Sequence, residues 1–359
     1  MYSDPDLDAA ARSGALPPFW AERFRSFVAR ERGTPAADEE HVRLLSSFND
    51  LFVTGALLLF MGGVAVLVSQ GPGPAFGFGT LAMLAWLAGP YLILKRRMAL
   101  PAFVLALAFT FGIAGMLLVG FGVPVNLEFN QSYFPQALPE AAARLLTFGA
   151  AAVAAALHWW RFKVPAAMTL ALLLACIALN FVVGTALGTA ALAIPPAMPF
   201  LVYGLALFAV AMWWDMSDIY RQTRRADVAF WLHLAAASLI VHSLFAMLGL
   251  SAEGMDGPSA FVTILLYLLF CAVALIVDRR AMMVAGLLYV LAAFGALTFW
   301  IGTRSTAFTL AAIFVGASLL ALSVFWAHLR GLLLDRLPQK LRAQLPRSRV
   351  DLHGPRPID

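Results

Sequence analysis

The chain has 359 residues, of which 62% are hydrophobic and only 13% are charged. A soluble domain carries about 25% charged residues, so this composition excludes a water-soluble fold with a polar surface. The net charge of +5 raises the question of nucleic acid, but the basic residues are spread over alternate loops, as membrane topology alone requires. We therefore expect no nucleic-acid partner.

Residues 1–49 precede the first apolar run and predict a cytoplasmic helical segment. The turn Ser13-Gly14-Ala15-Leu16 separates an apolar stripe that starts at Leu7 from a second stripe that contains Phe19 and Phe24. Two interpretations remain open for this segment: a helical hairpin packed against the membrane bundle, and a module that binds a protein partner. Because residues 1–49 contain no apolar h-region of a signal peptide, we expect the first span to act as an uncleaved signal-anchor.

Ten apolar runs follow, each long enough to cross a bilayer as a helix, which requires about 20 residues. Backbone groups in lipid have no water to bond, so runs of this length must be helical. The runs are 51–69, 77–94, 99–121, 142–160, 165–187, 194–214, 228–249, 259–277, 280–301 and 305–327. They predict an all-α fold, a polytopic transmembrane helical bundle of about ten spans over residues 50–328.

The basic residues predict the orientation of this bundle, because cytoplasmic loops are enriched in Lys and Arg. All but two of the 25 Lys and Arg residues, the exceptions being Arg144 and Arg304, fall in the two tails and in or beside the loops after the second, fourth, sixth and eighth spans. A missed or extra span would break this alternation. We therefore predict that both the N-terminus and the C-terminus lie in the cytoplasm.

Residues 329–359 combine leucines with Arg and Lys, which predicts a cytoplasmic amphipathic basic tail. A helix of this kind lies in the plane of the membrane interface, and anionic lipids attract its basic face. The expected partner of the tail is therefore the lipid bilayer, through anionic headgroups at the cytoplasmic face.

Ionisable side chains within spans are costly and point to function by default. The seventh span is the richest: Asp227, Ser238 and His242 share one helical stripe, and His233 lies on nearly the opposite face. The two histidines are about 13.5 Å apart along a helix, too far to chelate one metal ion.

A second polar residue at membrane depth is Asn180 in the fifth span. Gly184 and Gly188 follow it at small-xxx-small spacing, which predicts close helix approach with Asn180 hydrogen-bonded across the interface. His158, beside two tryptophans, is expected at the membrane interface.

These polar residues have a functional and a structural interpretation. Imidazole groups relay protons or bind substrates, but polar side chains also hold helices together by interhelical hydrogen bonds. In the functional interpretation, the residues that form a substrate or proton pathway are His242, His233, Asn180, Ser238 and Asp227.

Signatures of catalysis and of cofactor binding are not found in the sequence. A Walker loop, a nucleophile elbow, an H-E-x-x-H motif and a dinucleotide fingerprint are all missing. Cys176 and Cys271 lie within apolar runs, without the spacing of a metal site or a disulfide framework. We therefore expect no cofactor, no metal site and no enzymatic activity.

Three stretches carry a resemblance. They are the turn at Ser13-Gly14-Ala15-Leu16 with its aromatic residues, the segment Asp227-Val-Ala-Phe-Trp-Leu-His233, and the ending Phe325-Trp326…Arg330…Leu337-Pro338. With them, the chain resembles a group of uncharacterised bacterial multi-pass membrane proteins. The resemblance implies the bacterial inner membrane as the location and implies no particular activity.

Two classes of function remain. The favoured class is a small-solute transporter or permease, because ten spans with both ends inside permit a five-plus-five inverted repeat, the layout of the drug/metabolite carriers. The alternative is a non-catalytic membrane scaffold or regulatory protein that acts through its N-terminal segment.

Overall fold

The computed structural model describes residues 7, 10, 11, 13–17, 19, 20, 24, 48–123, 139–188, 194–218, 223–250, 256–298, 304–339 and 345. The chain divides into two units. One comprises Met1–His41 with Arg347–Asp359, and the other is Val42–Pro346. Each unit is described by itself below.

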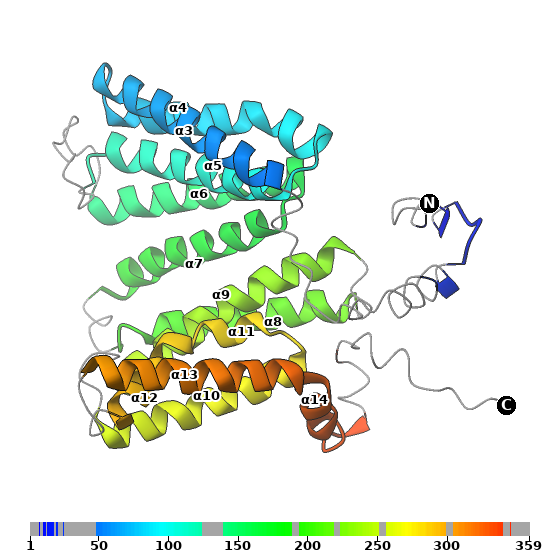
Figure 1. Ribbon diagram of the computed structural model, residues 1–359. Helices are drawn as coiled ribbons and strands as arrows, with labels where there is room; N and C mark the ends of the chain where they lie inside the picture. Colours follow the sequence, from blue (N-terminus) through cyan, green and yellow to red (C-terminus); the bar gives the residue numbers. More distant parts are fainter. Residues whose placement is uncertain are drawn as a thin grey trace. The chain divides into compact units, whose positions relative to one another are not determined.

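The larger unit contains the membrane helices (Figure 1). Within the described residues, nine helices are long and apolar enough to cross a membrane, and the secondary structure contains no strand. They are α3 (Phe48–Gln70), α4 (Pro74–Gly89) continued by the π-helical turn η1 (Pro90–Lys95), α5 (Ala99–Gly120), α6 (Glu140–Phe162), α7 (Pro165–Leu187), α8 (Met198–Met216), α9 (Arg224–Met247), α10 (Gly257–Val277) and α13 (Arg304–Val324). The protein is therefore an all-α, multi-pass integral membrane protein, as the sequence predicts.

The ninth predicted span is not one continuous helix, so this part of the prediction is wrong. The run 280–301 forms α11 (Ala281–Val284), a turn, and α12 (Leu287–Thr298). The aromatic ring of Tyr267 on α10 packs against Gly286 so closely that a Cβ there would lie 2.8 Å from the ring. The hydroxyl of Tyr267 donates a hydrogen bond to the Met283 carbonyl at 3.4 Å, beside the break. The described part of α12 has 12 residues and is about 18 Å long.

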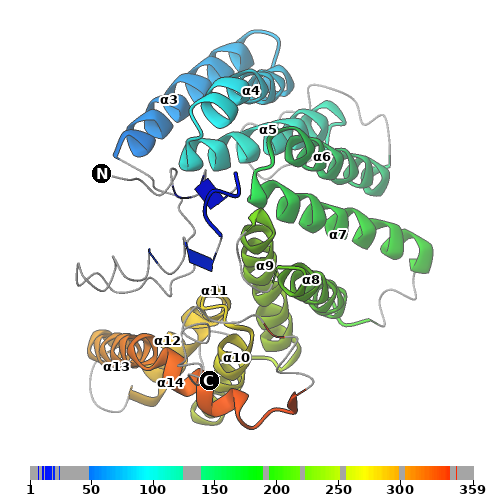
Figure 2. The same ribbon diagram turned by 90° about the vertical axis from the view of Figure 1, so that its right-hand side faces the viewer.

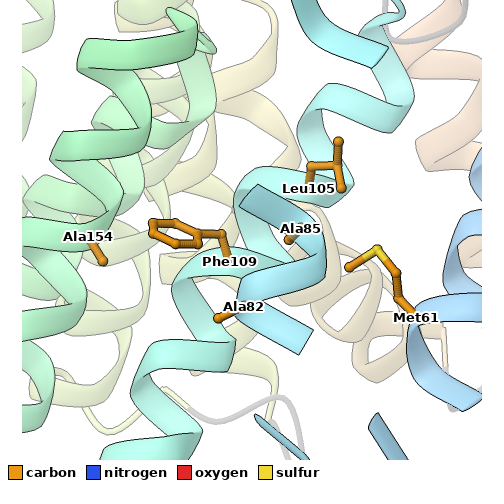
Figure 3. Close-up of a cluster of buried hydrophobic side chains, with 6 residues drawn as sticks. All are labelled: Met61, Ala82, Ala85, Leu105, Phe109 and Ala154. Atoms are coloured by element: carbon orange, nitrogen blue, oxygen red, sulfur yellow. The ribbon is translucent and has the colours of Figure 1, made fainter. Parts of the chain in front are cut away.

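The helices before the chain midpoint pack in sequence order. α3 contacts α4, α4 contacts α5, α5 contacts α6, and α6 contacts α7. A cluster of buried side chains joins four of these helices, and Phe109 of α5 points toward α6 within it (Figure 3). The cluster consists of Met61, Ala82, Ala85, Leu105, Phe109 and Ala154.

The second half packs differently. α8 and α9 lie side by side (Figure 2), and α9 also contacts α7 and α11. α12 packs between α10 and α13. α9 thus joins the two halves. In a five-plus-five repeat, α9 would correspond to α4, because each is the second span of its half. However, α4 packs mainly on α3 and α5, whereas α9 packs on α7, α8 and α11.

Close helix approaches lie at Gly77 and Gly112 rather than at the predicted glycines. A Cβ at Gly112 of α5 would lie 2.8 Å from the backbone nitrogen of Ala82 on α4. By contrast, no described atom lies within 4 Å of a Cβ built at Gly184 or Gly188. The prediction of a close approach at these two glycines is therefore wrong for the described part of the chain, because α7 presents them to open space.

Backbone conformations with positive φ occur at turns next to helices. Glycine occupies four such positions in the larger unit, Gly73, Gly122, Gly188 and Gly249. Residues with side chains occupy three more: Arg97 (φ 53°), Lys163 (φ 56°) and Asp278 (φ 60°).

The smaller unit is described at only a few positions. Leu7, Ala10 and Ala11 are helical, and Gly14 (φ 76°) lies in the turn over residues 13–16. The sequence prediction of a turn there is confirmed. The role of residues 1–49 remains a prediction, as does that of the tail 329–359, where the described helix α14 (Trp326–Leu334) gives way to residues mostly outside the described set.

Candidate functional site

A carboxylate is buried at the end of α8. Asp215 follows Trp213 and Trp214 in the last turn of this helix, and it is 0% exposed to solvent. An ionised carboxylate in such a place requires partners that neutralise it and occupy its lone pairs. Its partners come from α9 and from the turn between α10 and α11.

His233 is the partner on α9. Its Nε2 lies 2.8 Å from Oδ2 of Asp215, and the imidazole is also 0% exposed. A carboxylate only accepts hydrogen bonds, so Nε2 carries the hydrogen that is donated. His233 lies about 13.5 Å along α9 from the start of the helix.

Arg279 is the partner from the α10–α11 turn. Its Nε donates to Oδ2 of Asp215 at 3.1 Å and its Nη2 donates to Oδ1, so the guanidinium binds the carboxylate at two points. Nη2 also donates to the Ala226 carbonyl of α9 at 3.1 Å. Fork-shaped pairing of this kind fixes geometry as well as charge.

The backbone of the turn aims Arg279 at this cluster. Asp278 ends α10 in the left-handed conformation, and the amide of Arg279 donates to the Ala274 carbonyl at 2.9 Å. The next residues, Arg280 onward, lead directly into the short α11. The turn is therefore hydrogen-bonded to the end of α10, and Arg279 reaches back toward α8 and α9.

The residues on either side of Arg279 attach the same turn to α14. Trp326 donates its Nε1 hydrogen to Oδ1 of Asp278 at 2.8 Å, and Nε of Arg330 lies 3.7 Å from the same oxygen. The guanidinium of Arg280 lies 5.0 Å from the centre of the Trp326 ring, within the range of a cation–π contact. The segment Asp278-Arg279-Arg280 thus connects the end of α10 to α8 and α9 through Arg279, and to α14 through Asp278 and Arg280.

The buried cluster of Asp215, His233 and Arg279, called the Asp215 cluster below, is neutral overall when His233 is neutral. The negative charge of Asp215 is balanced by Arg279, and the imidazole donates without adding charge. Coulomb interactions are strong in a medium of low dielectric constant, so adding or removing one charge here is costly. A change in one charge of the cluster is therefore favourable only when a second charge changes with it.

Among the predicted pathway residues, His233 belongs to this cluster, whereas Asp227 and Ser238 do not. Asp227 is half-buried in the first turn of α9, and the charges of Arg279 and Arg224 act on it, although it forms no ion pair with any described residue. The Ser238 hydroxyl donates to the Leu234 carbonyl of its own helix at 2.9 Å. The common stripe on α9 therefore does not form one continuous polar path.

His242 forms a separate polar pair. Its Nδ1 lies 2.8 Å from the hydroxyl of Tyr289 on α12, one turn of helix beyond the break in the ninth span. The Tyr289 ring stacks on Phe245 with a centroid distance of 4.2 Å. His242 thus connects α9 to the broken span.

Asn180 lies half-buried on α7 without a side-chain hydrogen bond to any residue whose position is described. The cross-helix bond predicted for it is not found there. His158 is 0% exposed among the rings of Trp86, Phe109 and Phe162, and its position at the membrane interface stays a prediction. Both of its ring nitrogens lack a hydrogen-bond partner among the described atoms.

Sequence reasoning missed Asp215 and Arg279. Arg279 was counted as one of the loop cations that define topology, and Asp215 as a residue beyond the end of a span. A charged residue of each sign at the ends of two apolar runs was the available signal. No three His, Cys, Asp or Glu side chains in the described part of the chain lie together in a way that would hold a metal ion.

Comparisons with known proteins found no relationship. No protein-family model matches the chain, and neither curated proteins nor solved structures give a match.

Proposed function

We propose that this protein is a small-solute transporter of the bacterial inner membrane. The observation that carries the proposal is the Asp215 cluster, which holds the ends of α8 and α10 and the body of α9 together through one shared carboxylate. Charged groups within membrane helices commonly mark substrate, ion or proton pathways.

The broken ninth span supports the same proposal. Transporters place interrupted helices where solutes bind, because the interruption frees backbone groups and permits movement. Here the break at Gly286 lies between Arg279, which binds the cluster, and Tyr289, which binds His242. Arg279 thus connects the turn before α11 to α9, and Tyr289 connects α12 to α9.

We infer from this arrangement that the contact between Arg279 and Asp215 has a closed and an open state. When Arg279 binds Asp215, the turn before α11 is attached to α8 and α9; when it does not, this attachment is absent, while the turn stays bonded to α10 and α14. Alternating access needs a difference of this kind between two states, since packed helices shift between discrete arrangements rather than deform continuously.

A scaffold has less need of such a cluster. Buried ion pairs often contribute no more stability than well-packed apolar side chains of the same volume. A scaffold whose helices only had to stay together would be served by the apolar contacts that surround the cluster, such as those of Leu207 and Leu232.

Transport is tested with the purified full-length protein in proteoliposomes made with anionic lipid. Currents on a solid-supported membrane are recorded while solutes are added, in five groups: carboxylates, phosphates, amino acids, sugars and organic cations. A pH-sensitive dye inside the vesicles records any proton movement in parallel, so electroneutral transport is also detected.

We expect one solute group to give a current or a pH change, and Asp215→Asn to remove it. His158→Leu is the matched control, because it also alters a buried polar residue but lies outside the cluster. If wild-type vesicles respond to none of the five groups, the proposal of transport is rejected.

A further inference from the structure

We propose that Arg279 binds a small oxyanion, a carboxylate or a phosphate, and that a proton on His233 replaces its charge at Asp215. The protein would then carry the anion together with a proton. This inference rests on the proposed transport function and names its solute class.

The guanidinium of Arg279 has a shape that fits an oxyanion. A guanidinium binds a planar pair of oxygens through two parallel N–H groups, and it does so for Asp215 through Nε and Nη2. A solute carboxylate or phosphate presents the same pair of oxygens. Such a solute is therefore a direct competitor of Asp215 for Arg279, whereas a sugar or an organic cation is not.

The charge of Asp215 explains why a proton accompanies the anion. If Arg279 turns to a solute anion, Asp215 remains as a buried carboxylate with only His233 beside it. An unpaired charge at such a site is strongly unfavourable. Protonation of the His233 imidazole produces an imidazolium that keeps its hydrogen bond to Asp215, so both the Arg279–anion pair and the His233–Asp215 pair are neutral.

The described groups that face His233 are Asp215, Arg279 and uncharged side chains, and the charge of Asp227 also acts on Arg279. α8 contributes Asp215 and the uncharged ring of Phe208, whose centroid lies 5.3 Å from that of the imidazole. α7 contributes apolar side chains to the adjoining core, and the turn before α11 contributes Arg279. On α9 itself, the nearest described acid is the half-buried Asp227, six residues earlier in the chain.

The neighbouring contacts allow Arg279 to change partner without loss of the turn. Asp278 is held by Trp326, and the amide of Arg279 is bonded to Ala274, so the backbone stays anchored when the long side chain rotates. In the conformation described, Arg279 is 3% exposed, which corresponds to a state with no solute access.

The coupling has a defined sign. Anion binding to Arg279 and proton binding to His233 favour each other, so by linkage the affinity for the anion must rise as the pH falls. With one proton taken up per anion, the apparent dissociation constant of the anion decreases by up to about tenfold for each unit by which the pH falls.

The test uses the same proteoliposomes, with lactate and glycerol phosphate as probe anions and glucose and choline as non-anionic probes. We expect an inward anion gradient to acidify the interior of wild-type vesicles. His233→Gln should let the anion move without acidification, and Arg279→Gln should abolish anion movement. Arg225→Gln, which alters an exposed arginine on the first turn of α9, should behave as wild type.

Because Arg279→Gln leaves Asp215 without its cation and thus endangers folding, a second measurement uses only the wild-type protein. Lactate or glycerol phosphate should raise its thermal stability in detergent more at about pH 6 than at about pH 8, because proton uptake accompanies anion binding.

Three outcomes overturn the inference. Transport of glucose or choline but of neither anion rejects the solute class while leaving the transport function standing. Anion transport without proton movement, or anion stabilisation independent of pH, rejects the coupling. If no solute moves, the transport function itself fails.

Discussion

Asp215 and Arg279 are 64 residues apart in the chain, yet their side chains form a buried two-point ion pair. The pair joins the last turn of α8 to the turn before α11, and His233 binds the same carboxylate from α9. Each member is buried, so its charge or hydrogen bond depends on the others. The stability of this cluster is therefore expected to be strongly non-additive.

Replacement of either member of the ion pair should destabilise the protein more than replacement of both. Asp215→Asn or Arg279→Gln leaves one buried charge without its partner, at a cost of about 3–5 kcal/mol. The double variant removes both charges and should lose much less than the sum of the two single changes. Thermal unfolding in detergent measures all four proteins. Additive losses would show that the pair is not energetically coupled.

The two fully buried histidines should respond in opposite directions to the same substitution. His158→Leu removes an imidazole without a hydrogen-bond partner in the described structure, and it should stabilise the protein by about 1–2 kcal/mol. His233→Leu removes a donor to Asp215 and should destabilise it. Melting temperatures of both variants check the pair of expectations, and a loss of stability in His158→Leu would indicate that the imidazole has a partner.

Gly112 and Gly184 offer a matched test of helix packing. Gly112→Ala places a methyl group against the α4 backbone at Ala82, so α4 and α5 must separate and the protein should be destabilised. Gly184→Ala meets no described atom within 4 Å, and the better helix propensity of alanine should leave stability unchanged or raised by up to about 1 kcal/mol. Equal effects at both positions would contradict the close approach at Gly112.

The predicted orientation is tested by reporter fusions in a bacterial host. A green fluorescent protein fused after residue 97 or 163 should fluoresce, because those turns are expected in the cytoplasm. Alkaline phosphatase fused after residue 122 or 188 should be active, because those turns are expected outside. Activity of both reporters at positions on the same predicted side would refute the alternation of loops.

The sequence was a good guide to features that depend on composition and a poor guide to those that depend on distant contacts. Long apolar runs correctly predicted α3 to α10 and α13, because lipid imposes length and helicity on each span separately. The break in the ninth span lies inside a continuous apolar run. It lies where the Tyr267 ring of α10 packs against Gly286, a contact that periodicity does not reveal.

The sequence predicts only one member of the Asp215 cluster, because the other two are brought to it by contacts between distant segments. His233 stood out because an ionisable group within a span is rare. Its partner Asp215 lies 18 residues before it and Arg279 lies on a later turn, so neither is within reach along one helix. His242 also stands out, but Ser238 on its stripe binds the backbone of its own helix and Asp227 forms no ion pair with any described residue, whereas Tyr289 of α12 is the residue that meets His242.

The positive-φ turns of the larger unit carry a consequence for how this chain enters the membrane. On the predicted outer side, the described positions of this kind hold glycine, and on the predicted cytoplasmic side they hold Arg97, Lys163 and Asp278. A side chain in the left-handed conformation costs about 1–2 kcal/mol, which glycine avoids. Lys163→Gly would relax the backbone but would remove a cation that directs orientation during insertion. Folding stability and membrane insertion thus place opposite demands on a single residue.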